Sequence, residues 1–265
     1  MKLPEITNKQ KEILHLVPKF RYLNRAHIQS FLHHKQRQYI NKWLYDLSEK
    51  NYLLKQYSNK IVGKNRIPAI YSMNTNGIRY VKKLELFDTT YLNKLYYDKT
   101  RSDTFITHCL FLATICMQLE GKQNSTLTYT YITTNEWQKE SHPFHFLKEH
   151  ALTADVCFSK KQKGKKTRYY LLEIFDETLP RYRIRKRIRD YFTFFFNNQW
   201  EDTIKEDFPI LLFVAFSKEK MIYNKRYLKK IFREYDSPED LKMYVAVAYD
   251  IQTENVTGNI WEEIT

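Results

Sequence analysis

Apolar residues recur at helical spacing three times within the first 50 residues of the chain. Thr7 and Gln10 fit a capping box ahead of an apolar stripe, so a first helix is predicted to begin there and to end at Pro18. Leu23 and Asn24 offer the start of a short second helix. A third helix is predicted from about residue 35 to residue 50, because its apolar side chains follow the i, i+3, i+4, i+7 pattern. These side chains are Ile40, Trp43, Leu44 and Leu47.

Two β-rich runs follow the third helix. Residues 52–57 and 68–73 read as strands, and the basic segment 59–66 joins them. Three helices and a two-stranded hairpin within about 80 residues are typical of the winged helix-turn-helix, in which one helix enters the major groove of DNA and the wing reaches the neighbouring backbone. We therefore expect residues 1–83 to form a winged helix-turn-helix domain.

The rest of the chain predicts a connecting helix and a mixed α/β domain. Residues 84–101 predict the connecting helix or linker, and a long apolar helix that must be buried follows from Ser102 or Asp103. Strands are expected at 125–133, 152–158, 168–175, 210–216 and 243–248, with helices at 181–197 and 224–235. The order αβββαβ, followed by αβ, is that of the restriction-endonuclease-like fold. Residues 102–265 are thus expected to form a nuclease-like α/β (α+β) domain with a mixed central sheet.

Positive charge is concentrated at the N-terminal end. Residues 1–83 hold 17 of the 44 Lys and Arg residues but four of the 30 Asp and Glu residues, which gives a net charge of +13. The remaining 182 residues carry 27 basic and 26 acidic groups. A polyanion relieves the self-repulsion of so one-sided a segment, and double-stranded DNA is the expected partner.

Composition argues against several other classes. Five glycines leave little scope for a glycine-rich phosphate loop, so nucleotide hydrolysis is not expected. No stretch approaches the roughly 20 apolar residues that span a bilayer, so we expect a cytoplasmic protein with no membrane partner. Cys109, Cys116 and Cys157 form no C-x-x-C pair and are interpreted as reduced core thiols.

The third predicted helix carries the side chains expected to contact DNA. Arg37, Gln38 and Asn41 can read base edges, since Arg suits guanine and Gln or Asn suits adenine. Phosphate contacts are expected from Lys35, Lys42, Lys60, Lys64 and Arg66. The alternative is a solvated helix face beside an exposed loop. Because palindromic sites mirror two-fold symmetry, a homodimer is a candidate assembly.

Two acidic residues on neighbouring predicted strands form a candidate metal site. Asp155 and Glu173 each lie among apolar residues, and two such carboxylates can hold a Mg²⁺ ion that activates water against a scissile phosphate. Active enzymes of the nuclease-like fold usually carry lysine two places after the strand acid, where this chain has Phe175. Lys186 on the following helix is the candidate replacement, so the predicted catalytic set is Asp155, Glu173 and Lys186.

These groups also have simpler interpretations. Asp155 and Glu173 can pair with basic neighbours such as those between Arg181 and Arg189 and catalyse nothing. A tyrosine relaxase needs a His-hydrophobe-His pair, and the sequence has none. Surface histidines are favoured over a zinc site, because no cysteine or acid stands at ligand spacing beside His142, His145 and His150.

Several short motifs accompany the predicted winged helix over most of the chain. They are His108, Ala154-Asp155, Leu172-Glu173-Ile174, Thr178, Lys186 and Tyr191. This combination resembles the replication-relaxation family of bacterial plasmids and other mobile elements. The family pattern is Pro-Asp and then Glu-x-Asp, whereas this chain has Ala154 and Phe175 at those places and Asp176 one place late. The resemblance implies a role in plasmid replication and in relaxing plasmid DNA, without fixing a chemistry.

Two functions are therefore expected. The first is a DNA-binding protein in replication, relaxation or mobilisation of a plasmid or other mobile element, whose nuclease-like domain is a scaffold for DNA or for replication or transfer proteins. The alternative is a Mg²⁺-dependent site-directed endonuclease or nickase that uses Asp155 and Glu173. Phe175 favours the first. The basic clusters 160–168 and 181–189 flank the two acids and form a second candidate surface for DNA.

Overall fold

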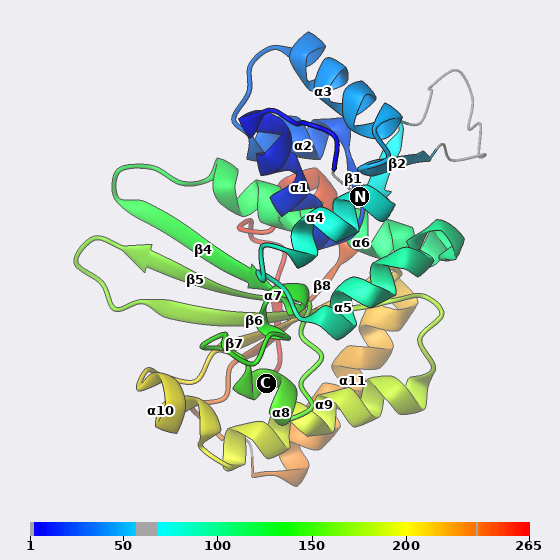
Figure 1. The fold of residues 1–265 in the computed structure, drawn as a ribbon. Helices are drawn as coiled ribbons and strands as arrows, with labels where there is room; N and C mark the ends of the chain where they lie inside the picture. Colours follow the sequence, from blue (N-terminus) through cyan, green and yellow to red (C-terminus); the bar gives the residue numbers. More distant parts are fainter. Residues whose placement is uncertain (1–2, 57–67, 237) are drawn as a thin grey trace. The chain divides into compact units, whose positions relative to one another are not determined.

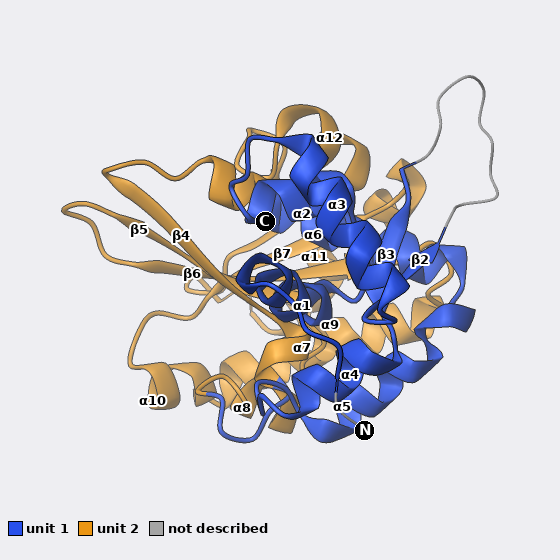
Figure 2. Cartoon of the chain, turned by 45° about the horizontal axis from the view of Figure 1, so that its top comes forward, with its two compact units in different colours: residues 1–117, 138–142 blue, residues 118–137, 143–265 orange. Residues whose placement is uncertain are grey.

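The computed structural model describes residues 3–56, 68–236 and 238–265, and Figure 1 traces its helices and strands. The chain divides into two compact units, coloured separately in Figure 2. Unit 1 comprises residues 1–117 and 138–142, and unit 2 comprises residues 118–137 and 143–265. The helices and strands expected to bind DNA belong to unit 1, and the two candidate acidic residues belong to unit 2.

Unit 1 consists of helices around a small antiparallel sheet. Its helices are α1 (Asn8–Phe20), α2 (Arg25–Phe31), α3 (Arg37–Glu49), α4 (Thr75–Lys82), α5 (Thr89–Lys94), the 3₁₀ helix η1 (Leu95–Thr100) and the larger part of α6 (Asp103–Gly121). Its strands are β1 (Leu23–Asn24), β2 (Leu53–Gln56) and β3 (Ile70–Met73), which pair in the order β1-β3-β2. The three predicted helices and both predicted strands are therefore present, and β1 is an addition that the sequence pattern did not predict.

The capping box at the start of α1 is confirmed. Thr7 Oγ1 accepts a hydrogen bond from the Gln10 amide at 3.4 Å, and Gln10 Oε1 accepts one from the Thr7 amide at 2.8 Å. The predicted end at Pro18 is wrong, since α1 continues to Phe20. Pro18 removes one backbone donor, but Pro18 and Phe20 are both buried in the core, and that burial offsets the loss.

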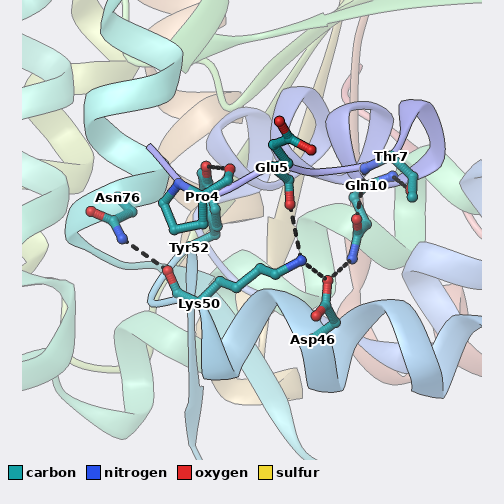
Figure 3. Close-up of polar contacts among 8 residues, drawn as sticks. All are labelled: Pro4, Glu5, Thr7, Gln10, Asp46, Lys50, Tyr52 and Asn76. Atoms are coloured by element: carbon teal, nitrogen blue, oxygen red, sulfur yellow. Dashed lines mark hydrogen bonds and ion pairs between the residues drawn. The ribbon is translucent and has the colours of Figure 1, made fainter. Parts of the chain in front are cut away.

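A polar network joins α1, α3 and the start of α4 (Figure 3). Lys50 Nζ donates to the Glu5 carbonyl at 2.9 Å and to Asp46 Oδ2 at 2.8 Å, and Gln10 Nε2 donates to the same Asp46 oxygen at 2.6 Å. The Lys50 carbonyl accepts from Asn76 Nδ2 at 2.9 Å. Partial burial alone would raise the pKa of Asp46, but the hydrogen bonds from Lys50 and Gln10 lower it. The network fixes the rotation of α3 about its axis, with Ile40, Leu44 and Leu47 buried as predicted.

Helix α4 packs against the backbone at the start of β2, a contact that the sequence pattern did not predict. The Asn74 amide donates to the Tyr52 carbonyl at 2.9 Å, and a Cβ atom added at Gly77 would lie 2.2 Å from the same carbonyl oxygen. Only glycine leaves room for an approach this close. The connecting helix predicted for residues 84–101 is in fact two elements, α5 and η1, because Asp88 caps a new helix by accepting from the Tyr91 amide at 2.9 Å.

Helix α6 is the long apolar helix that the sequence predicts. Within the described residues it is the one helix long and apolar enough to cross a membrane by length and composition, contrary to the expectation that no stretch approaches this limit. A buried core helix passes the same test. In α6, Cys109, Ala113 and Cys116 are buried, as the thiol interpretation predicted for the first and last of them.

Unit 2 is built on a six-stranded mixed sheet. Its strands are β4 (Leu127–Thr133), β5 (Val156–Gln162), β6 (Arg168–Phe175), β7 (Ile210–Ala215), β8 (Met243–Val247) and β9 (Glu262–Glu263), which lie in this order across the sheet. Neighbours are antiparallel except β6–β7 and β7–β8, which are parallel. Its helices are α7 (Thr134–Trp137), α8 (Phe146–Glu149), α9 (Arg181–Phe196), α10 (Gln199–Ile204), α11 (Lys218–Glu234) and α12 (Ala248–Glu254). The predicted mixed α/β fold with a mixed sheet is confirmed.

The largest differences from the predicted element boundaries in unit 2 are at β5 and α11. Strand β5 begins at Val156, so Asp155 lies one residue before it, and the strand runs on into the basic segment to Gln162. Lys160 and Lys161 sit in this strand because both pair with β4. Helix α11 begins at Lys218, where Ser217 caps it, six residues before the predicted start.

Helices α9 and α11 lie side by side in Figure 1 and cover one face of the sheet. Their inward side chains Ile184, Ile188 and Leu228 share one core cluster with Leu171 and Phe213 of the sheet. This packing sets which residues of α9 face the strands and which face solvent.

Candidate functional site

The first turns of α3 display the three side chains predicted to read bases. Arg37, Gln38 and Asn41 are exposed and line one shallow hollow together with Gln36. The opposite side of α3 is held in the core, so these three side chains are presented on a fixed helix face. The structure thus brings the predicted reading set together.

The predicted phosphate contacts are distributed more widely. Lys35 lines a neighbouring hollow with Arg25 and Gln29 of α2, and Gln29 Nε2 fixes the intervening turn by donating to the carbonyls of His34 at 3.1 Å and Lys35 at 3.3 Å. Lys42 lines a different hollow beside Asp46. Lys60, Lys64 and Arg66 lie outside the described residues.

Two features beside α3 were not predicted. Burial lowers the pKa of Arg25, and the positive charge of the nearby Arg37 is the next largest cause that lowers it. The rings of His34 and Tyr39 pack on Trp43, with centroids 5.1 and 6.2 Å from the indole, and Tyr39 is 45% exposed. Helical periodicity gives no signal for the first feature, because Arg25 and Arg37 lie on different helices.

Glu173 lies at the centre of a buried polar cluster in unit 2. It projects from β6 and is fully buried. Its Oε1 accepts hydrogen bonds from Thr153 Oγ1 at 2.7 Å and from Arg187 Nη1 at 2.8 Å, and its Oε2 accepts one from the Tyr191 hydroxyl at 2.7 Å. Asp155 lies nearby, and its Oδ2 accepts from the Ile174 amide at 2.7 Å. The cluster therefore satisfies both oxygens of the buried carboxylate.

The electrostatics of the cluster follow from burial. Burial raises the pKa of Glu173 and the charge of Asp155 acts in the same direction, whereas Arg187, Tyr191 and Thr153 act against them. Burial and the charge of Glu173 raise the pKa of Tyr191 well above its usual value, so its hydroxyl stays a donor. Burial alone would lower the pKa of Arg187, but Glu173 raises it.

Lys186 does not join Asp155 and Glu173. Its side chain is 68% exposed, and its Nζ lies 2.8 Å from Asp190 Oδ2. One residue along a helix is a rotation of about 100°, so Arg187 turns towards the sheet where Lys186 turns away. Phe175 is fully buried and stacks on Phe213, so it belongs to the core of the unit.

These residues do not fit a Mg²⁺ ion. Magnesium takes oxygen ligands and water, whereas the oxygens of Glu173 accept from a guanidinium and two hydroxyl groups. Among residues 3–56, 68–236 and 238–265, no group of three or more His, Cys, Asp or Glu side chains is arranged to hold a metal ion. For the predicted histidines, His145 Nδ1 lies 3.1 Å from the Trp137 carbonyl, and His150 packs against Phe194.

A family comparison covers both α3 and the acidic cluster. The model of the family described as replication-relaxation matches residues 14–206, which include α3, Asp155, Glu173 and the whole of α9. No curated protein and no solved structure matches the chain. Because the match spans well over half of the sequence, the chain belongs to the replication-relaxation family.

Proposed function

We propose that this protein binds double-stranded DNA through α3 and acts in the replication, relaxation or mobilisation of a plasmid or another mobile element. Membership of the replication-relaxation family suggests the role in plasmid replication or relaxation. The observation that carries the DNA-binding proposal is the shared exposed hollow of Arg37, Gln38 and Asn41 on a helix whose other side is buried.

The order of elements in unit 1 supports a winged helix-turn-helix. Helices α1, α2 and α3 are followed by the antiparallel pair β2–β3, and β1 completes a three-stranded sheet. In this motif the second helix of the helix-turn-helix enters the major groove with its N-terminal residues on base edges. Helix α3 takes that place here, and Arg37 stands at its first position.

The charge around α3 also favours a polyanionic ligand. Arg25 and Arg37 lie close enough for one to lower the pKa of the other, and phosphate groups relieve this repulsion. Lys35 and Lys42 lie exposed on either side of the reading set and are proposed as phosphate contacts. That Lys60, Lys64 and Arg66 of the wing contact phosphate groups stays a prediction from the sequence.

Unit 2 is proposed to act as a nuclease-like scaffold that contacts DNA or replication and transfer proteins. The hydrogen bonds that hold Glu173 give it a structural role, so no cleavage step is assigned to Asp155, Glu173 or Lys186. A homodimer is proposed as the assembly that would match a palindromic site.

Selection of duplexes from a random library tests the proposal. Full-length protein should enrich a defined site, and the triple variant Arg37→Ala, Gln38→Ala, Asn41→Ala should bind the selected and the scrambled duplex almost equally, because it lacks the base-reading side chains. The matched control replaces an exposed amide and an exposed cation of α1, Asn8→Ala with Lys11→Ala, and should keep full discrimination. Equal enrichment by the triple variant and the wild type would show that α3 does not read DNA.

A further inference from the structure

We infer that α9 and α11 form a second DNA-contacting surface, in which a ladder of arginines stacked on tyrosines binds the phosphodiester backbone. This inference rests on the proposed function in taking double-stranded DNA as the ligand. It concerns side chains of unit 2, and therefore does not depend on α3 being the element that reads bases. We call these side chains the arginine ladder: Arg181, Arg185 and Arg189 of α9 with Tyr223 and Tyr227 of α11.

The ladder runs along the seam between the two helices. The guanidinium of Arg181 lies 4.7 Å from the ring centroid of Tyr223, and that of Arg185 lies 5.8 Å from Tyr223 and 5.3 Å from Tyr227. Arg185 Nε also donates to the Tyr223 hydroxyl at 2.7 Å. Burial raises the pKa of Tyr227, and the positive charge of Arg189 is the strongest of the effects that lower it.

The three arginines are among the cations of these helices for which the described part of the chain shows no ion pair with an acid. Within the described part of the chain, no carboxylate lies within ion-pair distance of Arg181, Arg185 or Arg189, and all three are exposed. By contrast, several lysines of the same helices pair with acids. These pairs are Lys186 with Asp190, Lys220 with Glu177, Lys225 with Glu262 and Lys230 with Glu234.

The local charge is large even though unit 2 is nearly neutral as a whole. Helix α9 carries six basic residues and one acidic residue, and α11 carries seven basic residues and two acidic ones. Two adjacent helices that both carry a net positive charge repel each other, and the tyrosine rings between them relieve this repulsion only partly. An extended polyanion relieves the remainder along the whole seam.

The geometry suits a phosphate backbone better than a single anion. Arg181, Arg185 and Arg189 repeat every four residues, which spaces them by about 6 Å along the helix. The guanidinium groups of Arg181 and Arg185 each lie over a tyrosine ring, and both residues are exposed, so little rotamer freedom is lost when a phosphate binds. Arginine also contacts phosphate with two parallel hydrogen bonds, which lysine cannot do.

The salt dependence of DNA binding tests this surface. The probe is a duplex of scrambled sequence, and the protein is the full chain. The ladder variant Arg181→Gln, Arg185→Gln, Arg189→Gln should lower the slope of log K against log salt by about 2 to 3, because each lost phosphate contact removes about 0.9. Circular dichroism and urea unfolding of each variant verify that it is folded, and the single variant Arg189→Gln should still lower the slope by about 1.

A second triple variant removes the same number of positive charges, one from α9 and two from α11. Lys186→Gln, Lys225→Gln, Lys230→Gln replaces lysines that pair with acids, and its slope should stay within about 1 of the wild type. An unchanged slope in the ladder variant, or an equal fall in both triple variants, would overturn the arginine ladder. The α3 triple variant separates this result from the proposed function. If the α3 triple variant loses discrimination between sites and the ladder variant keeps the wild-type salt slope, only the proposal that α3 reads DNA stands. If the α3 triple variant keeps discrimination and the ladder variant has a lower salt slope, only the arginine ladder stands.

Discussion

The guanidinium of Arg187 lies 2.8 Å from Oε1 of Glu173, a carboxylate that is fully buried. This contact decides the interpretation of the acidic cluster. A carboxylate that is to hold a metal ion needs oxygens open to the ion and to water, whereas here a guanidinium and two hydroxyl groups take them. The pair therefore anchors α9 to β6, and through α9 it supports the arginine ladder.

Breaking this pair should destabilise unit 2. Arg187→Ala leaves a buried carboxylate without its cation and should lower the free energy of unfolding by about 3 kcal/mol. The neighbouring control Lys186→Ala removes an exposed pair and should cost less than about 1 kcal/mol. Urea unfolding measures both. Equal losses would mean that Arg187 does not anchor the helix.

The Arg187→Ala loss should also depend on pH. The pKa of Glu173 is already raised by burial, and removal of Arg187 raises it further. A carboxyl whose folded pKa lies above its unfolded value loses stability as the pH rises through the folded pKa. The variant should therefore lose more stability above neutral pH than in mild acid, as urea unfolding at several pH values would measure.

Tyr191→Phe should test the hydroxyl at the centre of the cluster. It keeps the packing of the ring and removes the donor to Glu173 Oε2, so a buried acceptor loses its partner at a cost of about 1 to 3 kcal/mol. Tyr182→Phe on the same helix is the control, since that side chain is 66% exposed and should cost almost nothing. Thermal unfolding compares the two, and a Tyr191→Phe variant as stable as the control would contradict the assigned contact.

His27 gives unit 1 a dependence on pH. Burial lowers its pKa to about 4, and its ring contacts Asn24 N at 3.5 Å through Nδ1 and Thr114 Oγ1 at 3.1 Å through Nε2. The unfolded chain takes up a proton at His27 near pH 6.5, before the folded one does, so stability is lost as the pH falls from there towards 4, by up to about 3 kcal/mol.

His27→Gln should remove this part of the acid sensitivity. Glutamine at the third helical position can keep the capping box, yet it does not titrate. Unfolding free energies measured between pH 4 and pH 7 should fall less steeply in the variant than in the wild type. Identical slopes would mean that His27 is not the group responsible.

Gly77→Ala should be poorly tolerated. The added Cβ would lie 2.2 Å from the Tyr52 carbonyl oxygen and 2.8 Å from Met73 Cε, so α4 would have to move away from β2 at a cost of about 1 to 3 kcal/mol or more. At Gly121 the added Cβ meets nothing within 4 Å, which makes Gly121→Ala the matched control. A loss of thermal stability confined to the first variant is expected.

The sequence predicts most of the elements because their apolar periods are clear. The capping box of α1 and the apolar stripe of α3 both survive in the structure, and so does β6, whose bounds match the prediction. Helix α4 was missed because an eight-residue helix offers only two turns of pattern, and its packing depends on Gly77 and the Tyr52 backbone.

The contacts of Glu173 could not be predicted from the sequence, because they depend on how α9 is rotated about its axis. The period of α9 shows that Ile184 and Ile188 face the core, but it does not say how the helix is rotated above β6. Since neighbouring residues differ by about 100°, a small rotation decides whether Lys186 or Arg187 reaches the buried acid. The arginine ladder needed the same information, because the tyrosines that stack on it come from α11.

A base-by-base binding scan tests the central claim most directly. Every base pair of the selected duplex is substituted in turn, and the affinity of full-length protein is compared with that of Arg37→Ala. If α3 lies in the major groove, Arg37→Ala should lose about 1 to 3 kcal/mol of preference at one or two adjacent base pairs and keep the preference elsewhere. A variant that weakens binding uniformly, with every preference unchanged, would contradict the assignment of α3 as the helix that reads DNA.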